Sequence, residues 1–250
     1  MYGAERSADE IREKVRGHID SVKSRKMGRY AKIVEHMPKG GQRVLDFGCG
    51  WGYYAVAAAE RGNTVVGIDH SANEIEICRL MWGDCDHLDL TFEQGDIGEF
   101  PDASFDTVIS TSVLEHVHNP GLYLSQVNRV LREGGQLILS LPNVMTPRNA
   151  RGALSKNLSA ALQRFSLEVF ESYDKTHHHI NSWDPYHVTR LCASVGFRVD
   201  EFAGAEGLAM PRIPLVPAYV HTRIRCLEGF SYIMVFSLRK ITDVRISDRD

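Results

Sequence analysis

Three features that the sequence lacks restrict where the protein can act. No apolar stretch approaches the roughly 20 residues of a membrane-spanning helix. Residues 1–14 are too rich in charge for a secretory signal peptide. An excess of positive charge is also missing, since 32 acidic residues outnumber 29 basic ones and leave a net charge of −3. We therefore expect a soluble, cytoplasmic protein with no integral membrane segment and no nucleic-acid partner, for which only peripheral membrane contact stays open.

The cysteines are few, and their spacing suits neither disulfides nor a structural metal. There are five, an odd number, and no two of them form a Cys-x-x-Cys pair. This pattern argues against a disulfide framework or a structural zinc site and fits a reducing compartment. Internal repeats and low-complexity tracts are also absent, so we expect the 250 residues to form a single domain with additional segments.

What the sequence does have is a regular alternation of strand-like and helix-like segments. Apolar side chains at helical spacing in residues 9–37 predict one or two leading helices. Short apolar runs follow, and they predict strands at 43–48, 64–69, 90–96, 105–111, 136–142, 197–204 and 230–240. The helices predicted between them are 53–62, one capped by Ser71, 120–135 and 184–197. This alternation is typical of a parallel sheet covered on both faces, and it predicts a doubly wound α/β sandwich.

Two longer segments, 143–182 and 205–229, interrupt this alternation. Irregular segments of such length in a compact domain are often lids or binding loops. We therefore expect a helical lead-in at 1–42, a ligand-binding domain at 43–240 with these two segments as acceptor-side insertions, and a polar tail at 241–250. The prolines of the second segment favour a lid over a hydrophobic acceptor rather than a helix lying on a membrane.

The stretch VLDFGCGWG at 44–52 predicts a ligand site. Its buried strand passes Asp46 and leads into three glycines, which permit positive φ and close approach of the backbone to a ligand. The next strand ends at Asp69, 21 residues after Gly48, the spacing at which an acidic side chain binds a ribose diol. Ligands of open parallel sheets lie beyond the carboxyl ends of such strands. A tight turn without a ligand is the alternative.

The pattern favours S-adenosylmethionine over a nicotinamide dinucleotide. A dinucleotide fingerprint has the form Gly-x-Gly-x-x-Gly, but Tyr53 stands where the third glycine is required. The carboxylate of Asp46 also suits an ammonium group better than a doubly negative pyrophosphate. S-adenosylmethionine carries an ammonium group and a ribose but no phosphate, and its carboxylate can bind the backbone of the glycine turn. We expect it to be the cofactor and S-adenosylhomocysteine to be the product, which disfavours an NAD-dependent oxidoreductase.

Five stretches together resemble class I S-adenosylmethionine-dependent methyltransferases. They are VLDFGCGWG, VVGIDHS, EQGDI, FDTVISTSVLEHV and VLREGGQLILSLPN. They look most like the branch that includes ubiquinone-biosynthesis-type O-methyltransferases, over residues 30–143 and more loosely to residue 240. The resemblance implies an enzyme of class EC 2.1.1.- with a Rossmann-like three-layer fold. It also implies a mostly parallel seven-stranded sheet, in which the last strand, here 230–240, is antiparallel.

The resemblance further implies a role for each residue of the cofactor site. Asp46, Gly48 and Gly50 would hold the methionine part, Asp69 the ribose, His70 and Asp96 the adenine together with the backbone of Ile97, and Thr111 the sulfonium side. Two of these residues also have simpler interpretations. Asp96 suits a turn, and His70 suits a solvent-facing helix start.

Two histidines are candidate general bases. His116 follows the fourth predicted strand, where the methyl group should lie, and an imidazole has a suitable pKa near neutrality. A structural histidine that bridges loops is the alternative. In the resemblance, His179 aligns with a histidine that faces the acceptor, although an exposed, structural or metal-binding role stays open. Adjacent residues of the triplet 177–179 project in different directions and His118 is poorly spaced to pair with His116, so we expect no metal.

The sequence therefore predicts transfer of a methyl group to a hydroxyl of a small, lipid-like or sugar-like acceptor. After the fourth predicted strand, STSVLEHV offers hydroxyl groups and an imidazole. The nitrogen methylases of the family often have an acidic or asparagine-containing loop at this place. Transfer to nitrogen or carbon, and a non-catalytic cofactor-binding protein, are the alternatives.

Overall fold

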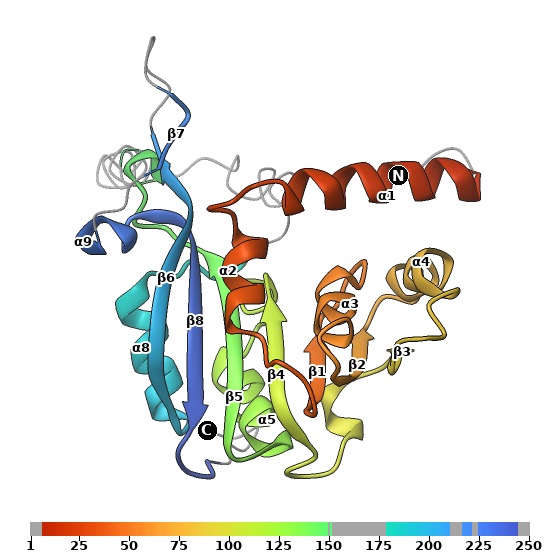
Figure 1. The fold of residues 1–250 in the computed structure, drawn as a ribbon. Helices are drawn as coiled ribbons and strands as arrows, with labels where there is room; N and C mark the ends of the chain where they lie inside the picture. The colour runs from red at the N-terminus through yellow and green to blue at the C-terminus, as the bar shows by residue number, and fades with distance from the viewer. Residues whose placement is uncertain (1–6, 150, 152–178, 211–216, 222–224, 245–250) are drawn as a thin grey trace, which may run out of the picture.

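The computed structural model describes residues 7–149, 151, 179–210, 217–221 and 225–244, which form one eight-stranded sheet (Figure 1). The strands are β1 Arg43–Phe47, β2 Thr64–Asp69, β3 Leu90–Gln94, β4 Phe105–Thr111, β5 Leu131–Pro142, β6 Phe197–Ala209, β7 Tyr219–Val220 and β8 Ser231–Lys240. Their order across the sheet is β3-β2-β1-β4-β5-β8-β6-β7. The pairs among β1 to β5 are parallel, whereas β8 is antiparallel to both of its neighbours. The predicted fold class is confirmed, with one strand more than expected.

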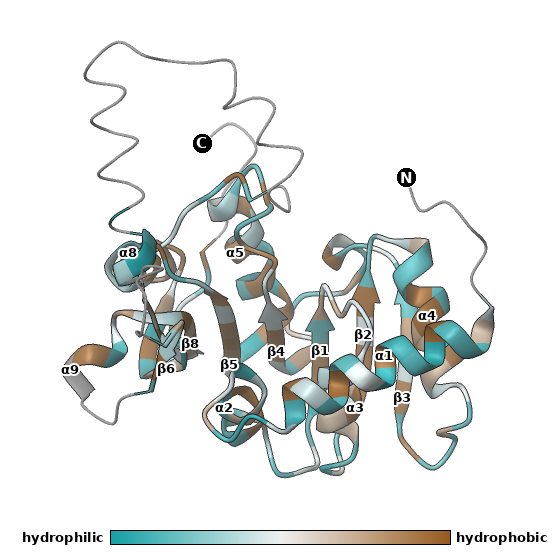
Figure 2. Cartoon of the chain, turned by 90° about the horizontal axis from the view of Figure 1, so that it is seen from above, coloured by the Kyte–Doolittle hydropathy of each residue, from teal (hydrophilic) through white to brown (hydrophobic). Residues whose placement is uncertain are grey.

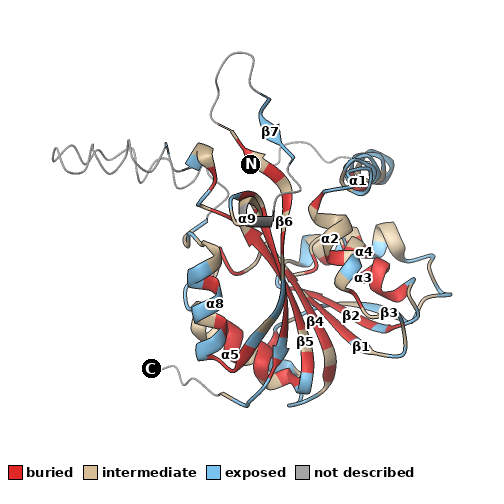
Figure 3. Cartoon of the chain, turned by 60° about the vertical axis from the view of Figure 1, so that its left-hand side comes forward, coloured by how far each residue is buried: buried red, intermediate tan, exposed pale blue. Residues whose placement is uncertain are grey.

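Helices cover both faces of this sheet. They are α1 Ala8–Lys23, α2 Arg29–His36, α3 Tyr53–Ala59, α4 Ala72–Trp82, the short 3₁₀ helix η1 Ile97–Glu99, α5 Pro120–Val130, α8 Pro185–Ser194 and α9 Arg225–Glu228. On one face, α2 and α3 pack Ile33 and Tyr54 against Val44 of β1. On the other face, α5 and α8 contribute Leu124 and Val188 to a second buried cluster. Figure 3 shows buried residues along the strands, between these two helical layers.

Local sequence sets several element boundaries as predicted. Ser71 begins α4, because its side chain accepts a hydrogen bond from the Glu74 N–H. Pro185 stands in the first turn of α8, and the preceding Asp184 caps that helix. Both arrangements satisfy N–H groups that a helix start leaves without partners.

One predicted helix is shorter than expected. The segment 120–135 reads as a helix that a glycine ends, but α5 stops at Val130. Leu131 adopts an extended backbone and pairs with Phe105 of β4. The sheet therefore takes the residues that helical periodicity had assigned to α5.

The prediction that 205–229 is irregular is wrong at its beginning, where β6 continues to Ala209. Two residues with positive φ, Glu206 at 62° and Gly207 at 73°, form an irregularity between Ala205 and Leu208. The strand then resumes and pairs with β7 and β8. Such a bulge bends a strand without ending it, and its glycine makes the sequence look like a loop.

The carboxyl ends of the parallel strands meet beneath α1, which lies across the upper end of the sheet and over α3 (Figures 1 and 2). Val15 and Ile19 form the buried side of α1, and the His18 ring lies edge-on to Trp51 with centroids 5.2 Å apart. With 16 residues, α1 is the longest helix described, and no described helix is long and apolar enough to cross a membrane. The neighbours of β1 are β2 and β4, so the chain changes direction beside β1 and leaves a crevice there.

Candidate active site

A cavity of about 470 Å³ lies at the carboxyl ends of β1, β2 and β4. The residues predicted from the sequence that line it are Gly48, Gly50, Asp69, His70, Thr111 and His116. The other lining residues are His18, Arg29, Cys49, Trp51, Tyr53, Tyr54, Glu74, Ser112 and Val113. The fold thus gathers most of the predicted cofactor residues around one cavity, at the switch point of the sheet.

The glycine turn after β1 is packed so closely that side chains do not fit. Gly48 has φ 77°, and a Cβ at this position would clash with Val113. Gly52 has φ 74°, and its Cβ would lie 2.6 Å from the ring of Phe92. The N–H of Gly48 donates to the Ile68 carbonyl at 2.9 Å, which fixes the turn against β2. Glycine is required here for backbone conformation and for space.

Asp69, at the end of β2, holds this turn in place. Its Oδ2 accepts the Gly50 N–H at 3.0 Å and its Oδ1 accepts the Ser71 N–H at 2.9 Å. The side chain is 10% exposed and lines the cavity. A carboxylate accepts about four hydrogen bonds, so both oxygens still have capacity for a ribose diol. His70 beside it is 95% exposed, and the solvent-facing interpretation of this residue fits the structure.

Asp46 and Tyr54 are buried polar residues whose hydrogen bonds are incomplete. Neither carboxylate oxygen of Asp46, nor the Tyr54 hydroxyl, has a hydrogen bond of normal geometry among the described residues. Burial raises the pKa of Asp46 to about 7; the Ala55 N–H lowers it and the charge of Asp69 raises it. Unpaired buried polar groups are rare in folded proteins. Tyr54 lines the cavity, whereas Asp46 is not among its lining residues, so contact of Asp46 with the cofactor stays a prediction.

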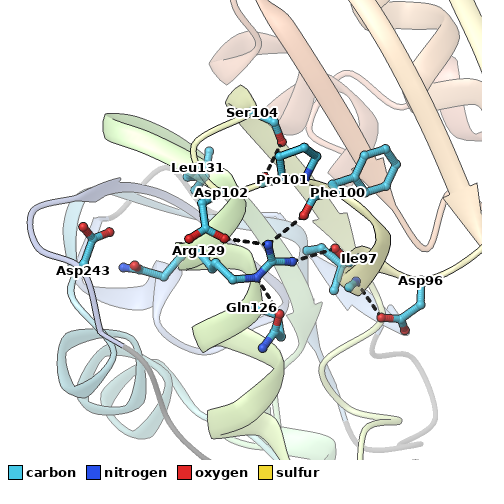
Figure 4. A network of polar contacts seen from close by, with 12 residues as sticks. Asp96, Ile97, Phe100, Pro101, Asp102, Ser104, Gln126, Arg129, Leu131 and Asp243 are labelled. Atoms are coloured by element: carbon cyan, nitrogen blue, oxygen red, sulfur yellow. Dashed lines mark hydrogen bonds and ion pairs between the residues drawn. The ribbon is translucent and has the colours of Figure 1, made fainter.

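Asp96 and Ile97 are not among the lining residues of the cavity. The Asp96 carboxylate accepts the Gly98 N–H at 2.9 Å and so caps η1. Ile97 is buried, and its carbonyl accepts a hydrogen bond from the Arg129 guanidinium at 2.9 Å. Figure 4 shows the contacts of Arg129 with η1 and with the loop after it. Asp96 thus has the turn role considered above, and contact with adenine stays a prediction for both residues.

A second cavity, of about 820 Å³, adjoins the first. The two share His18, Arg29 and Ser112 in their linings. The other residues around the larger cavity are Val22, Arg25, Lys26, Met27, Glu115, Pro142, His179, Glu206, Tyr219, His221, Tyr232 and Ile233. The site therefore consists of two chambers that meet at these shared residues.

Arg29 and Ser112 form the junction between the chambers. The Arg29 guanidinium donates to the Ser112 hydroxyl at 2.5 Å, and Ser112 has the unusual φ of 55°. A non-glycine residue in this conformation is strained, and such strain concentrates at functional sites. Sequence reasoning did not single out Arg29, because it starts a helix of the N-terminal lead-in and only the fold brings that helix to β4.

Glu115, His116 and His179 lie together beside this junction. The His116 and His179 rings are 4.8 Å apart between centroids, and the Glu115 carbonyl accepts the N–H groups of Ile180 and Asn181. One potential ligand atom from each of Glu115, His116 and His179 lies within 4.8 Å of the other two. Burial raises the pKa of Glu115 to about 7, although the charge of Arg29 opposes this. Glu115 was not predicted from the sequence. The absence of a metal ion at this group stays a prediction.

The remaining histidines of the sequence prediction are not part of this group. His118 is exposed and lines neither chamber. His177 and His178 lie outside the described residues. Of the triplet, only His179 can therefore be placed at the site.

Comparison with known proteins gives the reaction class of the chain. A family model described as a methyltransferase domain matches residues 38–190. The chain is a methyltransferase. It is 30% identical over 172 residues to a ubiquinone biosynthesis O-methyltransferase of Paracidovorax citrulli, which covers 68% of each chain. A protein of the same name from Thiobacillus denitrificans is 28% identical over 200 residues, covering 79% of this chain and 78% of the relative.

A solved structure supports the fold of this methyltransferase independently. The S-adenosylmethionine-dependent methyltransferase of Mesorhizobium loti superposes with a TM-score of 0.57 at 19% sequence identity, covering 84% of this chain and 97% of the other. S-adenosylmethionine is thus the cofactor, and the enzyme belongs to class EC 2.1.1.-. The smaller chamber fits its chemistry, because Asp69 offers acceptors to a ribose and Tyr54 lines the chamber with a hydroxyl that lacks a regular partner. Asp46 is not among the lining residues, and its contact with the ammonium group stays a prediction.

Proposed function

We propose that this methyltransferase transfers the methyl group to a hydroxyl of a small, lipid-like or sugar-like acceptor that lies in the larger chamber. The observation that carries the proposal is the pair His116 and His179 at the junction, with His116 on the cofactor side and His179 on the acceptor side. A hydroxyl must lose its proton as it attacks, and a neutral imidazole can accept that proton near pH 7.

The chain's own residues would act mainly by positioning. S-adenosylmethionine, when bound, supplies an electrophilic methyl group on its sulfonium. Ser112 and Arg29 orient the acceptor at the junction, and the walls of the two chambers hold the reacting groups in line. Such positioning can supply up to about 7–11 kcal/mol of the barrier reduction.

The proton of the acceptor hydroxyl moves to a ring nitrogen of His179 or His116 as the new carbon–oxygen bond forms. Both imidazoles are exposed, so the proton can pass on to solvent. Glu115, with its pKa raised to about 7, lines the same chamber and can accept a hydrogen bond or a proton there. A neutral-range base of this kind contributes about 10²–10⁴-fold to the rate.

The named relatives support oxygen as the nucleophile. Both are ubiquinone biosynthesis O-methyltransferases, although identities of 28–30% carry the reaction class further than the acceptor. Transfer to nitrogen or carbon is the alternative. An NAD-dependent oxidoreductase no longer competes, because the family match and Tyr53 at the third glycine position agree.

The experiment compares His116→Asn and His179→Asn with the unaltered enzyme at saturating cofactor. We expect at least one variant to lose 10²-fold or more in turnover, on the order expected for a general base. We also expect the rate of the unaltered enzyme to fall as the pH is lowered from about 8 to 5.5, because a protonated base cannot accept the proton of the hydroxyl. If neither variant loses more than a few-fold and the rate is flat between about pH 5.5 and 8, positioning alone carries the reaction.

A further inference from the structure

The larger chamber differs in charge from the rest of the molecule. The whole chain has a net charge of −3. The described residues that line this chamber include the cations Arg25, Lys26 and Arg29 but only two carboxylates, Glu115 and Glu206. A cleft lined by charge of one sign concentrates ligands of the opposite sign.

One of the two carboxylates already has a cationic partner within the protein. Glu206 Oε2 pairs with Arg25 at 3.0 Å, and Glu206 Oε1 accepts the backbone N–H of Arg29 at 3.1 Å. The Glu206 N–H in turn donates to the Met27 carbonyl at 3.1 Å. These contacts dock the connection between α1 and α2 onto β6, and they pair the charge of Glu206 with that of Arg25.

The second carboxylate balances little charge near neutral pH. Burial raises the pKa of Glu115 to about 7, so this group is only partly ionised there. Burial and the charges of Arg29 and Arg25 lower the pKa of His18, which keeps its imidazole neutral. Among the described residues, Lys26 has no ion-pair partner and its side chain is exposed. The chamber therefore carries positive charge that the described protein does not balance.

Part of the chamber's lining is apolar and aromatic. Tyr219 and Tyr232 face each other edge to face with centroids 5.8 Å apart, and Pro142 and Ile233 lie beside them. On the side of the cations, Met27 is 36% exposed. Apolar walls with a few placed polar groups are typical of sites for small molecules with an apolar body.

We infer that the acceptor is a small molecule with an apolar body and an anionic group, a carboxylate or a phosphate, and that Lys26 and Arg25 recognise this group. The inference rests on the proposed hydroxyl methylation, because it assigns the hydroxyl to the junction and the anion to the connection between α1 and α2. Lys26 supplies an unpaired ammonium. Arg25, paired at one edge with Glu206, still has donors for an anion, since a guanidinium has five N–H groups.

The test measures binding of matched probes to the full chain saturated with S-adenosylhomocysteine. Benzoate and benzamide have the same shape and differ by one charge, and phenyl phosphate tests the phosphate. We expect benzoate or phenyl phosphate to bind at least tenfold more tightly than benzamide. We also expect this preference to shrink as salt concentration rises, because exposed cations are screened.

The variants Lys26→Ala and Arg25→Ala, singly and together, are expected to reduce the preference to less than threefold without changing affinity for S-adenosylhomocysteine. Lys39→Ala, before β1 at the other end of the sheet, is the matched control and should keep the preference. Lys26→Ala removes no described hydrogen bond, so its fold should persist. Equal affinity for the charged and neutral probes, no binding of any probe, or an unchanged preference in both variants would overturn the inference.

A second measurement separates this inference from the proposed function. The atom that receives a labelled methyl group is determined from the product, independently of probe binding. A methyl group on nitrogen or carbon together with an anion preference would contradict only the hydroxyl assignment. A methyl group on oxygen without an anion preference would contradict only the role of Lys26 and Arg25.

Discussion

Asp69 and Asp46 leave neighbouring strands at the same edge of the sheet, yet their surroundings differ. Both oxygens of Asp69 accept backbone N–H groups, whereas neither oxygen of Asp46 has a hydrogen bond of normal geometry among the described residues. The first carboxylate therefore holds the turn and lines the smaller cavity, whereas the second is fully buried and does not line it. Each environment predicts a different response to substitution.

Asp69→Ala should weaken binding of S-adenosylmethionine severely while the protein stays folded. A charge-assisted hydrogen bond contributes about 1.5–3 kcal/mol, and the ribose diol would lose such an acceptor. Asp69→Asn keeps one acceptor oxygen and should lose less. Calorimetric titration measures both affinities, with circular dichroism as the check on folding. Unchanged affinity in a folded Asp69→Ala variant would remove Asp69 from the cofactor site.

Asp46→Asn should change how stability depends on pH. The pKa of Asp46 rises from 3.8 to about 7 in the folded protein. Between about pH 4 and 7, the folded state therefore keeps a proton that the unfolded state has released. The stabilisation of the folded state by this proton is fully present below about pH 4 and is lost as the pH rises through 7. An asparagine cannot ionise, so the cofactor-free variant should melt higher than its parent at pH 8.

At pH 8, the melting temperature of Asp46→Asn should exceed that of the parent protein by at least about 2–4 °C, the shift that corresponds to about 1 kcal/mol for a chain of this size. The gap should narrow at pH 5, where the parent's Asp46 is protonated. Thermal melting of both proteins at the two pH values measures it. A gap of equal size at both values would mean that ionisation of Asp46 is not its cause.

At the scale of elements, the turn between β1 and α3 was predictable and the course of β6 was not. The turn carries its own signal, because glycines follow an apolar strand and Asp69 ends the next one. β6 passes through Gly204 and Gly207, and its pairing with β8 across the bulge is set by residues more than twenty positions away. Local composition therefore suggested a loop where tertiary pairing makes a strand.

Gly52→Ala should destabilise the protein more than Gly50→Ala. Both glycines have positive φ, at 74° and 50°, so both substitutions incur the backbone cost of about 1 kcal/mol. Only at Gly52 would the new Cβ also meet the Phe92 ring, at 2.6 Å, whereas a Cβ at Gly50 meets nothing within 4 Å.

Crowding of this kind costs about 1–3 kcal/mol further. Urea unfolding of the two variants, measured without cofactor, gives the difference. Equal destabilisation would show that the Phe92 ring can shift without an energetic cost. The positive φ would then be the only reason for glycine at position 52.

At the scale of the whole molecule, the site is made by bringing the N-terminal lead-in onto the sheet. Arg29 begins α2 and reaches Ser112 after β4, and Arg25 in the connection before it reaches Glu206 of β6. The cofactor half could be predicted because its residues lie in motifs near the strand ends. The acceptor half could not, since Arg29, Glu115 and Glu206 come from three distant segments and share no spacing.

This arrangement is also consistent with one reaction that uses both chambers, as proposed. The smaller chamber holds residues that suit S-adenosylmethionine, the larger one holds apolar walls and cations, and they share His18, Arg29 and Ser112. In the proposed reaction, a methyl group carried in the first chamber passes this junction to reach an acceptor in the second. We propose that a hydroxyl of the acceptor receives the methyl group at this junction.

The most direct test supplies cofactor with a carbon-13-labelled methyl group and a mixture of small molecules extracted from cells. The carbon chemical shift of the transferred methyl group distinguishes an ether or ester from an amine and from a carbon-bound methyl. We expect a signal typical of a methyl group on oxygen, and we expect it to weaken strongly in the His116→Asn, His179→Asn double variant. A transferred methyl group found on nitrogen or carbon instead would contradict the claim.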